Sequence, residues 1–106
     1  MTGPDVRDAA PVVVVIEGEM TIWRAAELKQ ALLEPLDRAG PVEVDLSRVS
    51  EVDTAGVQLL MFARLTADAR CRRFRVVRQS EAVTAVLALL RLAAFFEGAP
   101  PPGAAG

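Results

Sequence analysis

The chain has 106 residues, of which 52% are hydrophobic, and its formal net charge is -2. That length predicts one compact domain with a single core. The slight acidic excess gives no reason to expect binding to nucleic acid or to an anionic membrane surface. The sequence has no histidine and one cysteine, Cys71, which excludes Ser/His/Asp and Cys/His nucleophilic sites and most zinc sites. We therefore expect a protein that is not an enzyme and holds no cofactor or metal.

The start of the sequence carries no targeting signal. It lacks the basic, apolar and small-residue sections of a secretory signal peptide, and the apolar run Val12–Ile16 is too short to cross a bilayer. We therefore expect a cytoplasmic protein without direct membrane insertion.

The first half of the chain predicts a strand followed by a helix. Residues 1–10 contain Gly, Pro and several charges, and we interpret them as a loose arm or an edge strand. A β-branched run bounded by Pro and Gly predicts a strand over residues 11–18. Thr21 is the expected N-cap of a helix that Pro35 kinks or ends. Its apolar face recurs at helical spacing and comprises Ile22, Ala25, Leu28, Leu32 and Leu36.

The second half repeats this alternation. The spacing of apolar residues predicts a strand, a helix and a strand over residues 42–46, 54–69 and 74–78. Ser80 is expected to cap a last amphipathic helix that reaches Leu90 or continues to Phe95. Residues 99–106 are only Pro, Gly and Ala, and we expect them to be disordered.

Alternating strands and helices predict an α/β fold in which right-handed crossovers join parallel strands. Val42, Val44 and Leu46 alternate with polar residues, which indicates that one face of the sheet is less covered than in a doubly wound fold. We predict one domain over residues 11–98, built on a small, mainly parallel, mixed sheet with helices.

Asp53 and Thr54 lie where the second predicted strand is followed by a helix. Sites of open α/β sheets form at this position, because strand C-termini and helix N-termini meet there. Taken one at a time, Asp53 and Thr54 are also common N-caps. The two interpretations remain open at this point.

The helix after Thr54 is apolar on almost every side. Its apolar residues are Val57, Leu59, Leu60, Met61, Phe62 and Ala63, and only Gln58 interrupts them. A helix on the outside of a sheet normally has one apolar stripe and one polar face. Either neighbouring helices cover the second side, or an apolar patch is exposed for a partner. The adjacent hydroxyl of Thr54 favours the partner.

The segment 45–60, which reads DLSRVSEVDTAGVQLL, resembles the signature of STAS domains. This family includes bacterial anti-sigma-factor antagonists and domains appended to sulphate transporters. The most specific part is Asp, then Ser or Thr, any residue and Gly, here Asp53 to Gly56. Gly18-Glu19-Met20 is similar to the Gly-Glu-Leu that follows the family's early strand. The resemblance covers about 12–96 and implies a small, mainly parallel sheet with helices.

The resemblance implies a regulatory role for Thr54. In the antagonists, a partner that is both kinase and anti-sigma factor phosphorylates the residue after the Asp, and only the unmodified form binds that partner. Catalysis then belongs to the partner, and this chain acts as a monomer or weak dimer. The implied contact surface comprises Thr21, Asp53, Thr54, Ala55, Gly56, Val57, Gln58, Met61 and Phe62.

Other branches of the family fit as well. Thr21 stands where several antagonists carry an acidic residue near the phosphorylation site. A threonine acceptor followed by Ala55 is shared with the STAS subunit of phospholipid-transport ABC complexes, which docks on the ATPase without established phosphorylation. Similar small domains also resemble chemotaxis-associated proteins. A small-ligand or nucleotide-binding module is a further hypothesis, although no Gly-rich phosphate loop is present.

Five arginines surround the third predicted strand: Arg70, Arg72, Arg73, Arg75 and Arg78. We interpret them as a solvated edge that deters strand-to-strand aggregation. The alternative is that they hold a partner's carboxylates or a phosphate.

Overall fold

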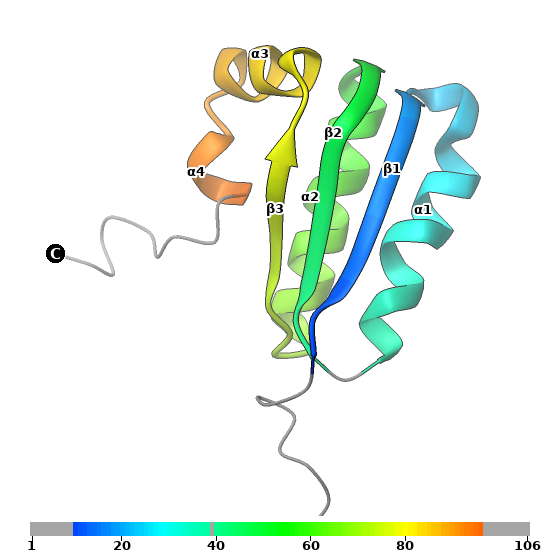
Figure 1. Ribbon diagram of the computed structural model, residues 1–106, viewed down its shortest axis with the longest axis vertical. Helices are drawn as coiled ribbons and strands as arrows, with labels where there is room; N and C mark the ends of the chain where they lie inside the picture. Colours follow the sequence, from blue (N-terminus) through cyan, green and yellow to red (C-terminus); the bar gives the residue numbers. More distant parts are fainter. Residues whose placement is uncertain (1–9, 39, 97–106) are drawn as a thin grey trace, which may run out of the picture.

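The computed structural model describes residues 10–38 and 40–96. One sheet is formed by β1 (Val12–Met20), β2 (Val42–Val52) and β3 (Phe74–Gln79), in the order β1-β2-β3 with both pairs parallel (Figure 1). The helices are α1 (Ala25–Leu33), α2 (Thr54–Ala69), α3 (Glu81–Leu89) and α4 (Ala93–Phe96), and 3₁₀ turns η2 (Ile22–Arg24) and η3 (Glu34–Asp37) flank α1. The predicted α/β fold with a small, mainly parallel sheet is confirmed. The antiparallel pairing that a mixed sheet requires is not found within residues 10–38 and 40–96, where both strand pairs are parallel. An arm or edge strand is predicted for residues 1–10, and the structure describes only Ala10 of these. The tail predicted for residues 99–106 also lies outside the described residues.

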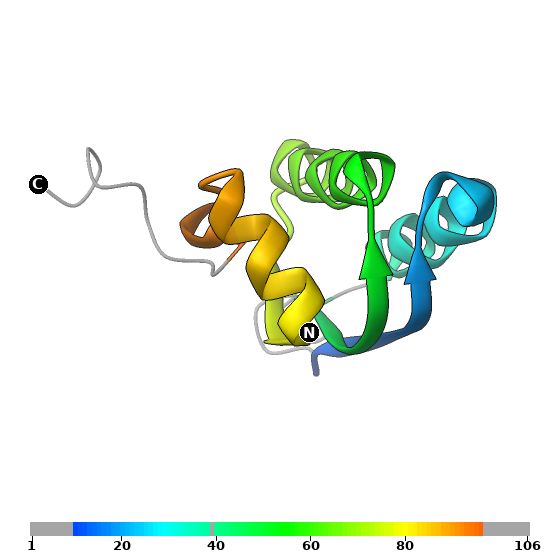
Figure 2. The same cartoon turned by 90° about the horizontal axis from the view of Figure 1, so that it is seen from above.

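Two helices cover one face of the sheet. Figure 2 shows α1 and α2 side by side on that face. Figure 1 shows α3 above the upper end of β3, and α3 also packs against β2. Val44 on β2 is fully buried toward the core. On the opposite face, the neighbours Val13, Glu43 and Arg75 form a row across the three strands, and Val13 is 60% exposed. The prediction that one face is less covered is confirmed.

The core is a single cluster of apolar side chains from every layer. Helix α2 contributes Val57, Leu60, Ala63 and Ala67, whose spacing of three and four residues places them on one helical face. Burying a Val or Leu side chain stabilises the fold by about 1.5–3 kcal/mol. This stripe fixes α2 on the sheet and thereby fixes which side of the helix faces solvent.

The helix predicted from Thr21 differs in its first turn. β1 continues to Met20, and the next three residues form the 3₁₀ turn η2 before α1 begins. Leu28, Leu32 and Leu36 are buried as expected, but Ile22 is 62% exposed. The prediction for Ile22 is wrong because a 3₁₀ turn has three residues per turn, so the α-helical face does not extend back to it.

Thr21 also behaves differently from a capping residue. It occupies the N-cap position of η2, but its side chain makes no capping hydrogen bond. Its backbone oxygen accepts a hydrogen bond from Arg24 N at 2.9 Å, while its hydroxyl is buried without a partner among the described residues. The side-chain cap predicted for Thr21 is therefore wrong.

Two further boundaries depend on contacts distant in sequence. β2 runs on to Val52 because the extended end of β1 pairs with it through two irregularities of register. The last predicted helix ends at Leu89, since Arg91 takes a left-handed φ of 58° and Leu92 N donates to Leu87 O at 2.8 Å. Ser80 caps α3 as predicted, with Oγ accepting from Val83 N at 3.2 Å. The alternative of a continuous helix to Phe95 is wrong.

None of the helices within residues 10–38 and 40–96 has the length and apolar character needed to cross a membrane.

Candidate partner-docking site

The carboxyl ends of β1 and β2 bring two helix starts together. Because the strands are parallel neighbours, η2 after β1 and α2 after β2 begin at the same edge of the sheet (Figure 1). The backbone N–H of Asp53 donates to Met20 O at 3.1 Å and joins the two strand ends directly. The site that the sequence places at Asp53 and Thr54 therefore includes the segment after β1 as well.

The Asp53 carboxylate holds this junction together. Oδ1 accepts a hydrogen bond from Gly56 N at 2.9 Å, which caps α2, and Oδ2 accepts from Ile22 N at 3.1 Å, which anchors η2. These backbone donors, Gly56 first and then Ile22, lower the pKa of Asp53. The prediction that Asp53 caps the helix is confirmed. Since both oxygens accept structural hydrogen bonds, Asp53 is poorly placed to take a proton from a neighbouring group.

Thr54 is the first residue of α2 and is exposed. In the described part of the chain, its hydroxyl forms no hydrogen bond, unlike the carboxylate of Asp53 beside it. The Thr54 hydroxyl is consequently accessible to another protein.

An open apolar groove of about 390 Å³ begins beside Thr54 and runs between η2–α1 and α2. Phe62 on its α2 side is 48% exposed, and Lys29 on its α1 side holds Nζ 5.7 Å from the centre of the Phe62 ring. The lining residues are Ile22, Ala25, Lys29, Ala55, Gln58, Leu59 and Phe62. The groove offers apolar contact along its floor and one positive charge.

Apolar side chains continue beyond the groove. Trp23 on η2 is 90% exposed, and Leu65, about one turn after Phe62 on α2, is 55% exposed. Helix α1 lies against α2, and Leu59 and Met61 are partly buried against the core. Both interpretations of the apolar helix are thus partly right: a neighbouring helix covers one side, and an exposed apolar surface remains.

A protein-family model matches most of this chain. The family model described as "Mlab, STAS domain" matches residues 5–97. The chain belongs to the STAS domain family. No curated protein matches it at a significant level.

Two solved structures share this STAS fold. One is a protein from Thermotoga maritima proposed to be an anti-sigma factor antagonist, with a TM-score of 0.69 and 21% identity over 80% of this chain and 76% of that chain. The other is the anti-sigma factor antagonist SpoIIAA in its unphosphorylated form, with a TM-score of 0.55 and 17% identity over 74% of each chain. At these identities the likeness shows the fold, and the resemblance to STAS domains is confirmed.

The structure divides the contact residues expected of this STAS domain into two groups. Asp53, Thr54, Ala55, Gln58 and Phe62 lie at or beside the groove. The remaining four are covered: Gly56, Val57 and Thr21 are buried, and Met61 is half-buried. The covered residues lie beneath this surface and contribute to its shape.

Sequence reasoning missed four lining residues of the groove. The sequence predicts Ile22 and Ala25 on the buried face of a regular helix. It places Leu59 among the apolar residues of the helix after Thr54 but outside the implied contact surface, and it assigns Lys29 to no site. The available signal is the combination of an apolar residue, Ile22, two positions after Met20 and a lone lysine one helix turn beyond Ala25. It requires knowing that α1 lies beside α2.

Proposed function

We propose that this STAS protein is a non-enzymatic partner-switching regulator, similar to an anti-sigma-factor antagonist, and that phosphorylation of Thr54 controls its binding. The supporting observation is that an exposed Thr54 hydroxyl, without a hydrogen bond to any described residue, lies next to the apolar groove that starts at Ala55. The unmodified protein binds a kinase-like, anti-sigma-type partner through this groove. The proposal places the protein in the cytoplasm, where the partner has ATP.

A phosphate on Thr54 changes the electrostatics of this edge. It adds about -1.5 to -2 charge at the start of α2. The nearby Gly56 amide already donates to Asp53, whose carboxylate adds like charge. Lys29 is the cation that lines the groove. The phosphorylated surface therefore carries excess negative charge. A partner that binds there through an apolar surface has to remove the water around this charge.

The fold itself is expected to change little, because Thr54 is exposed and a negative charge at a helix N-terminus is favourable by about 0.3–1 kcal/mol. Binding is affected more strongly, since desolvating a charge without a partner costs several kcal/mol. Changing the ratio of bound to free protein from 99:1 to 1:99 requires a change of about 5.5 kcal/mol in the binding free energy. Phosphorylation is consistent with a binding switch of that size.

The test uses the full chain, Mg-ATP and a purified kinase-type ATPase of the proposed anti-sigma class. Intact-mass measurement is expected to show one added phosphate on the wild type and none on Thr54→Ala. Thr84→Ala is the matched control, because Thr84 is another exposed helical threonine, on α3. Thr54→Glu is expected to lose partner binding. Phosphate on Thr54→Ala, or equal binding by wild type and Thr54→Glu, contradicts the switch.

A second candidate is a constitutive subunit that docks on a transporter ATPase, with Thr54 as a contact residue. The exposures of Trp23, Ile22 and Leu65 favour it, since a permanently covered interface accommodates large apolar side chains. Stable co-purification with an ABC-type ATPase, no phosphate after incubation with ATP and retained binding by Thr54→Glu support this candidate over the switch.

A further inference from the structure

The groove between η2–α1 and α2 has two walls with similar spacing along the chain. The α2 wall comes from residues at positions i, i+3, i+4 and i+7: Ala55, Gln58, Leu59 and Phe62. The opposite wall comes from positions i, i+3 and i+7: Ile22, Ala25 and Lys29. At 1.5 Å per residue the α2 wall is about 10.5 Å long, which is two helical turns. That length matches the apolar positions i, i+3, i+4 and i+7 on one face of another helix.

The groove presents apolar surface to solvent. Ile22 on one wall is 62% exposed, and Phe62 on the other is 48% exposed. Removing such surface from water is favourable. The groove therefore favours a ligand that brings an apolar face of its own.

Lys29 adds a positive charge that has no counterpart in the protein. It is the single lysine of the sequence, and within residues 10–38 and 40–96 it makes no ion pair, whereas five arginines do. The positions one helical turn away, 25, 26, 32 and 33, are Ala and Leu. Its Nζ lies 5.7 Å from the centre of the Phe62 ring, at the apolar wall. A carboxylate on the ligand is the complement of this charge.

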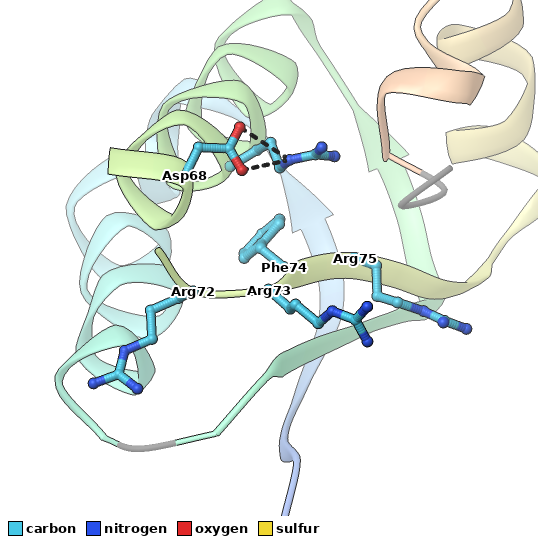
Figure 3. Close-up of a pocket in the computed structure, with 6 residues that line it drawn as sticks. Asp68, Arg72, Arg73, Phe74 and Arg75 are labelled. Atoms are coloured by element: carbon cyan, nitrogen blue, oxygen red, sulfur yellow. Dashed lines mark hydrogen bonds and ion pairs between the residues drawn. The ribbon is translucent and has the colours of Figure 1, made fainter. Parts of the chain in front are cut away.

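The arginines around β3 do not form a comparable site. A hollow of about 220 Å³ lies between the end of α2 and the start of β3, and Asp68 and Phe74 are among its lining residues (Figure 3). The Asp68 carboxylate there is already paired with Arg64. Arg73 and Arg75 extend from the face of β3 opposite to Phe74, so their charges do not converge in the hollow. This arrangement agrees with the interpretation of these arginines as a solvated edge.

The walls of the groove also select the conformation of the ligand. All its lining residues lie on η2, α1 or α2, so no strand edge borders it. An extended peptide that binds through its backbone requires such an edge, whereas an amphipathic helix satisfies its own backbone and docks through side chains. The groove therefore fits a helix better than a strand.

We propose that the groove binds an amphipathic helix of the partner, whose apolar face lies along the groove and which carries a carboxylate that pairs with Lys29. This inference rests on the docking groove of the proposed function and applies to the kinase-type partner and the transporter ATPase alike. Lys29 lies beside Phe62, whereas Thr54 lies next to Ala55, two helical turns away along α2. The ion pair is thus separate from the proposed phosphorylation site.

The test compares two dye-labelled synthetic helical peptides by fluorescence anisotropy. Both carry the same apolar stripe at positions i, i+3, i+4 and i+7, and the residues that flank the stripe at both ends are Glu in one peptide and Lys in the other. The full-length chain is expected to bind the Glu peptide about threefold to tenfold more tightly, although its net charge of -2 acts in the opposite direction. The preference is expected to shrink in about 1 M salt, where the screening length is about 3 Å.

Charge reversal at Lys29 is the decisive variant. Lys29→Glu is expected to prefer the Lys peptide. Arg38→Glu is the matched control, because it makes the same change of charge at an exposed position that does not line the groove, and it is expected to retain the preference for the Glu peptide. Phe62→Ala is expected to weaken both peptides by at least about fivefold, since it removes an apolar wall.

Amide NMR shifts caused by the Glu peptide are expected at the residues that line the groove. No saturable binding of the Glu peptide, equal or tighter binding of the Lys peptide by the wild type, or an unchanged preference in Lys29→Glu overturns the proposal. Sedimentation that shows a dimer of the free chain, dissociated by Phe62→Ala, also overturns it, because a second copy is then the occupant.

The peptide assay contains neither ATP nor a kinase, so its outcome is independent of the phosphorylation test. A preference that reverses in Lys29→Glu, together with no phosphate on Thr54, supports the helix and contradicts the switch. Phosphate on Thr54, together with an unchanged preference, supports the switch and contradicts the helix.

Discussion

Gly56, in the first turn of α2, lies directly against the backbone carbonyl of Met20, the last residue of β1. A Cβ atom added at Gly56 would lie 2.2 Å from Met20 O, closer than side-chain carbons approach such an oxygen. That oxygen also accepts the hydrogen bond from Asp53 N. The close approach of α2 to β1 therefore requires glycine, and it positions both helix starts that border the groove.

We predict that Gly56→Ala destabilises the fold by about 2 kcal/mol. Alanine gains up to about 1 kcal/mol in helix propensity, but overpacking against a fixed group costs about 1–3 kcal/mol or more. Met20 is fully buried and its carbonyl is bonded, so the larger cost is expected to prevail. Urea unfolding monitored by circular dichroism measures the difference.

Thr54→Ala, two residues earlier, is the control for Gly56→Ala. Thr54 is exposed, so we expect its change in unfolding free energy to stay within about 0.5 kcal/mol. A Gly56→Ala protein as stable as the wild type would show that α2 does not approach Met20 O this closely.

A substitution that removes the buried hydroxyl of Thr21 is expected to stabilise the fold, whereas Gly56→Ala is expected to destabilise it. The Oγ1 of Thr21 has no hydrogen-bond partner among the described residues, and the residue is 6% exposed. Valine has the same shape without the polar atom, and burying an unsatisfied polar group costs about 1–3 kcal/mol. We therefore predict that Thr21→Val raises the free energy of unfolding by about 1 kcal/mol in urea denaturation.

Thr21→Ser is the matched variant, because it keeps the hydroxyl and removes the methyl group. It is expected to lose about 1 kcal/mol from the deleted apolar contact. If Thr21→Val were the less stable of the two, the hydroxyl would have a bonding partner and the argument would fail.

The order of elements could be predicted from the sequence because it depends on local pattern. The apolar spacing of Leu28 and Leu32 places one helix face in the core, and Asp53 caps a helix within its own first turn. Such features require only neighbours along the chain.

The shape of the groove could not be predicted in this way. Ile22 is exposed because its amide donates to Asp53, 31 residues away, and because β1 pairs with β2 through shifts of register. The hollow between the end of α2 and the start of β3 is similar: Arg72 and Arg73 are neighbours in the sequence, but Arg64 lines the same hollow only because α2 packs against β3. Contacts distant in sequence decide both surfaces.

The hydrogen-bonded Asp53 carboxylate predicts that the stability of the fold depends on pH. The hydrogen bonds from Gly56 and Ile22 lower its pKa in the folded protein, so its contribution to stability is fully present above its unfolded pKa of about 3.9. This contribution is lost as pH falls through the lower folded pKa. Asp53→Asn, which does not ionise, is expected to be less stable than the wild type at neutral pH, and the gap is expected to narrow in acid.

Thermal unfolding of both proteins between neutral and acidic pH measures this gap. In the wild type, the NMR shift of the Gly56 amide is expected to titrate with the same midpoint as the Asp53 carboxyl, because one donates to the other. A gap between the two proteins that is independent of pH would show that the charge of Asp53 does not stabilise the junction.

Trp23 tests the docking surface separately from phosphorylation. It is the single tryptophan of the sequence and is 90% exposed on η2, next to the groove residue Ile22. We predict that Trp23→Ala changes the free energy of unfolding by less than about 0.5 kcal/mol. Partner affinity is expected to fall by about 2 kcal/mol, or roughly 30-fold, as for a tryptophan that anchors an interface.

Leu89→Ala is the matched control, since Leu89 is an apolar residue of α3 that is 80% exposed and lies outside the groove. It should leave both stability and affinity unchanged. Titration of each variant with the partner of the proposed switch, or with the transporter ATPase of the second candidate, measures the effect. Because both candidates use this apolar surface, unchanged affinity in Trp23→Ala would place the interface elsewhere on the domain, whichever partner binds.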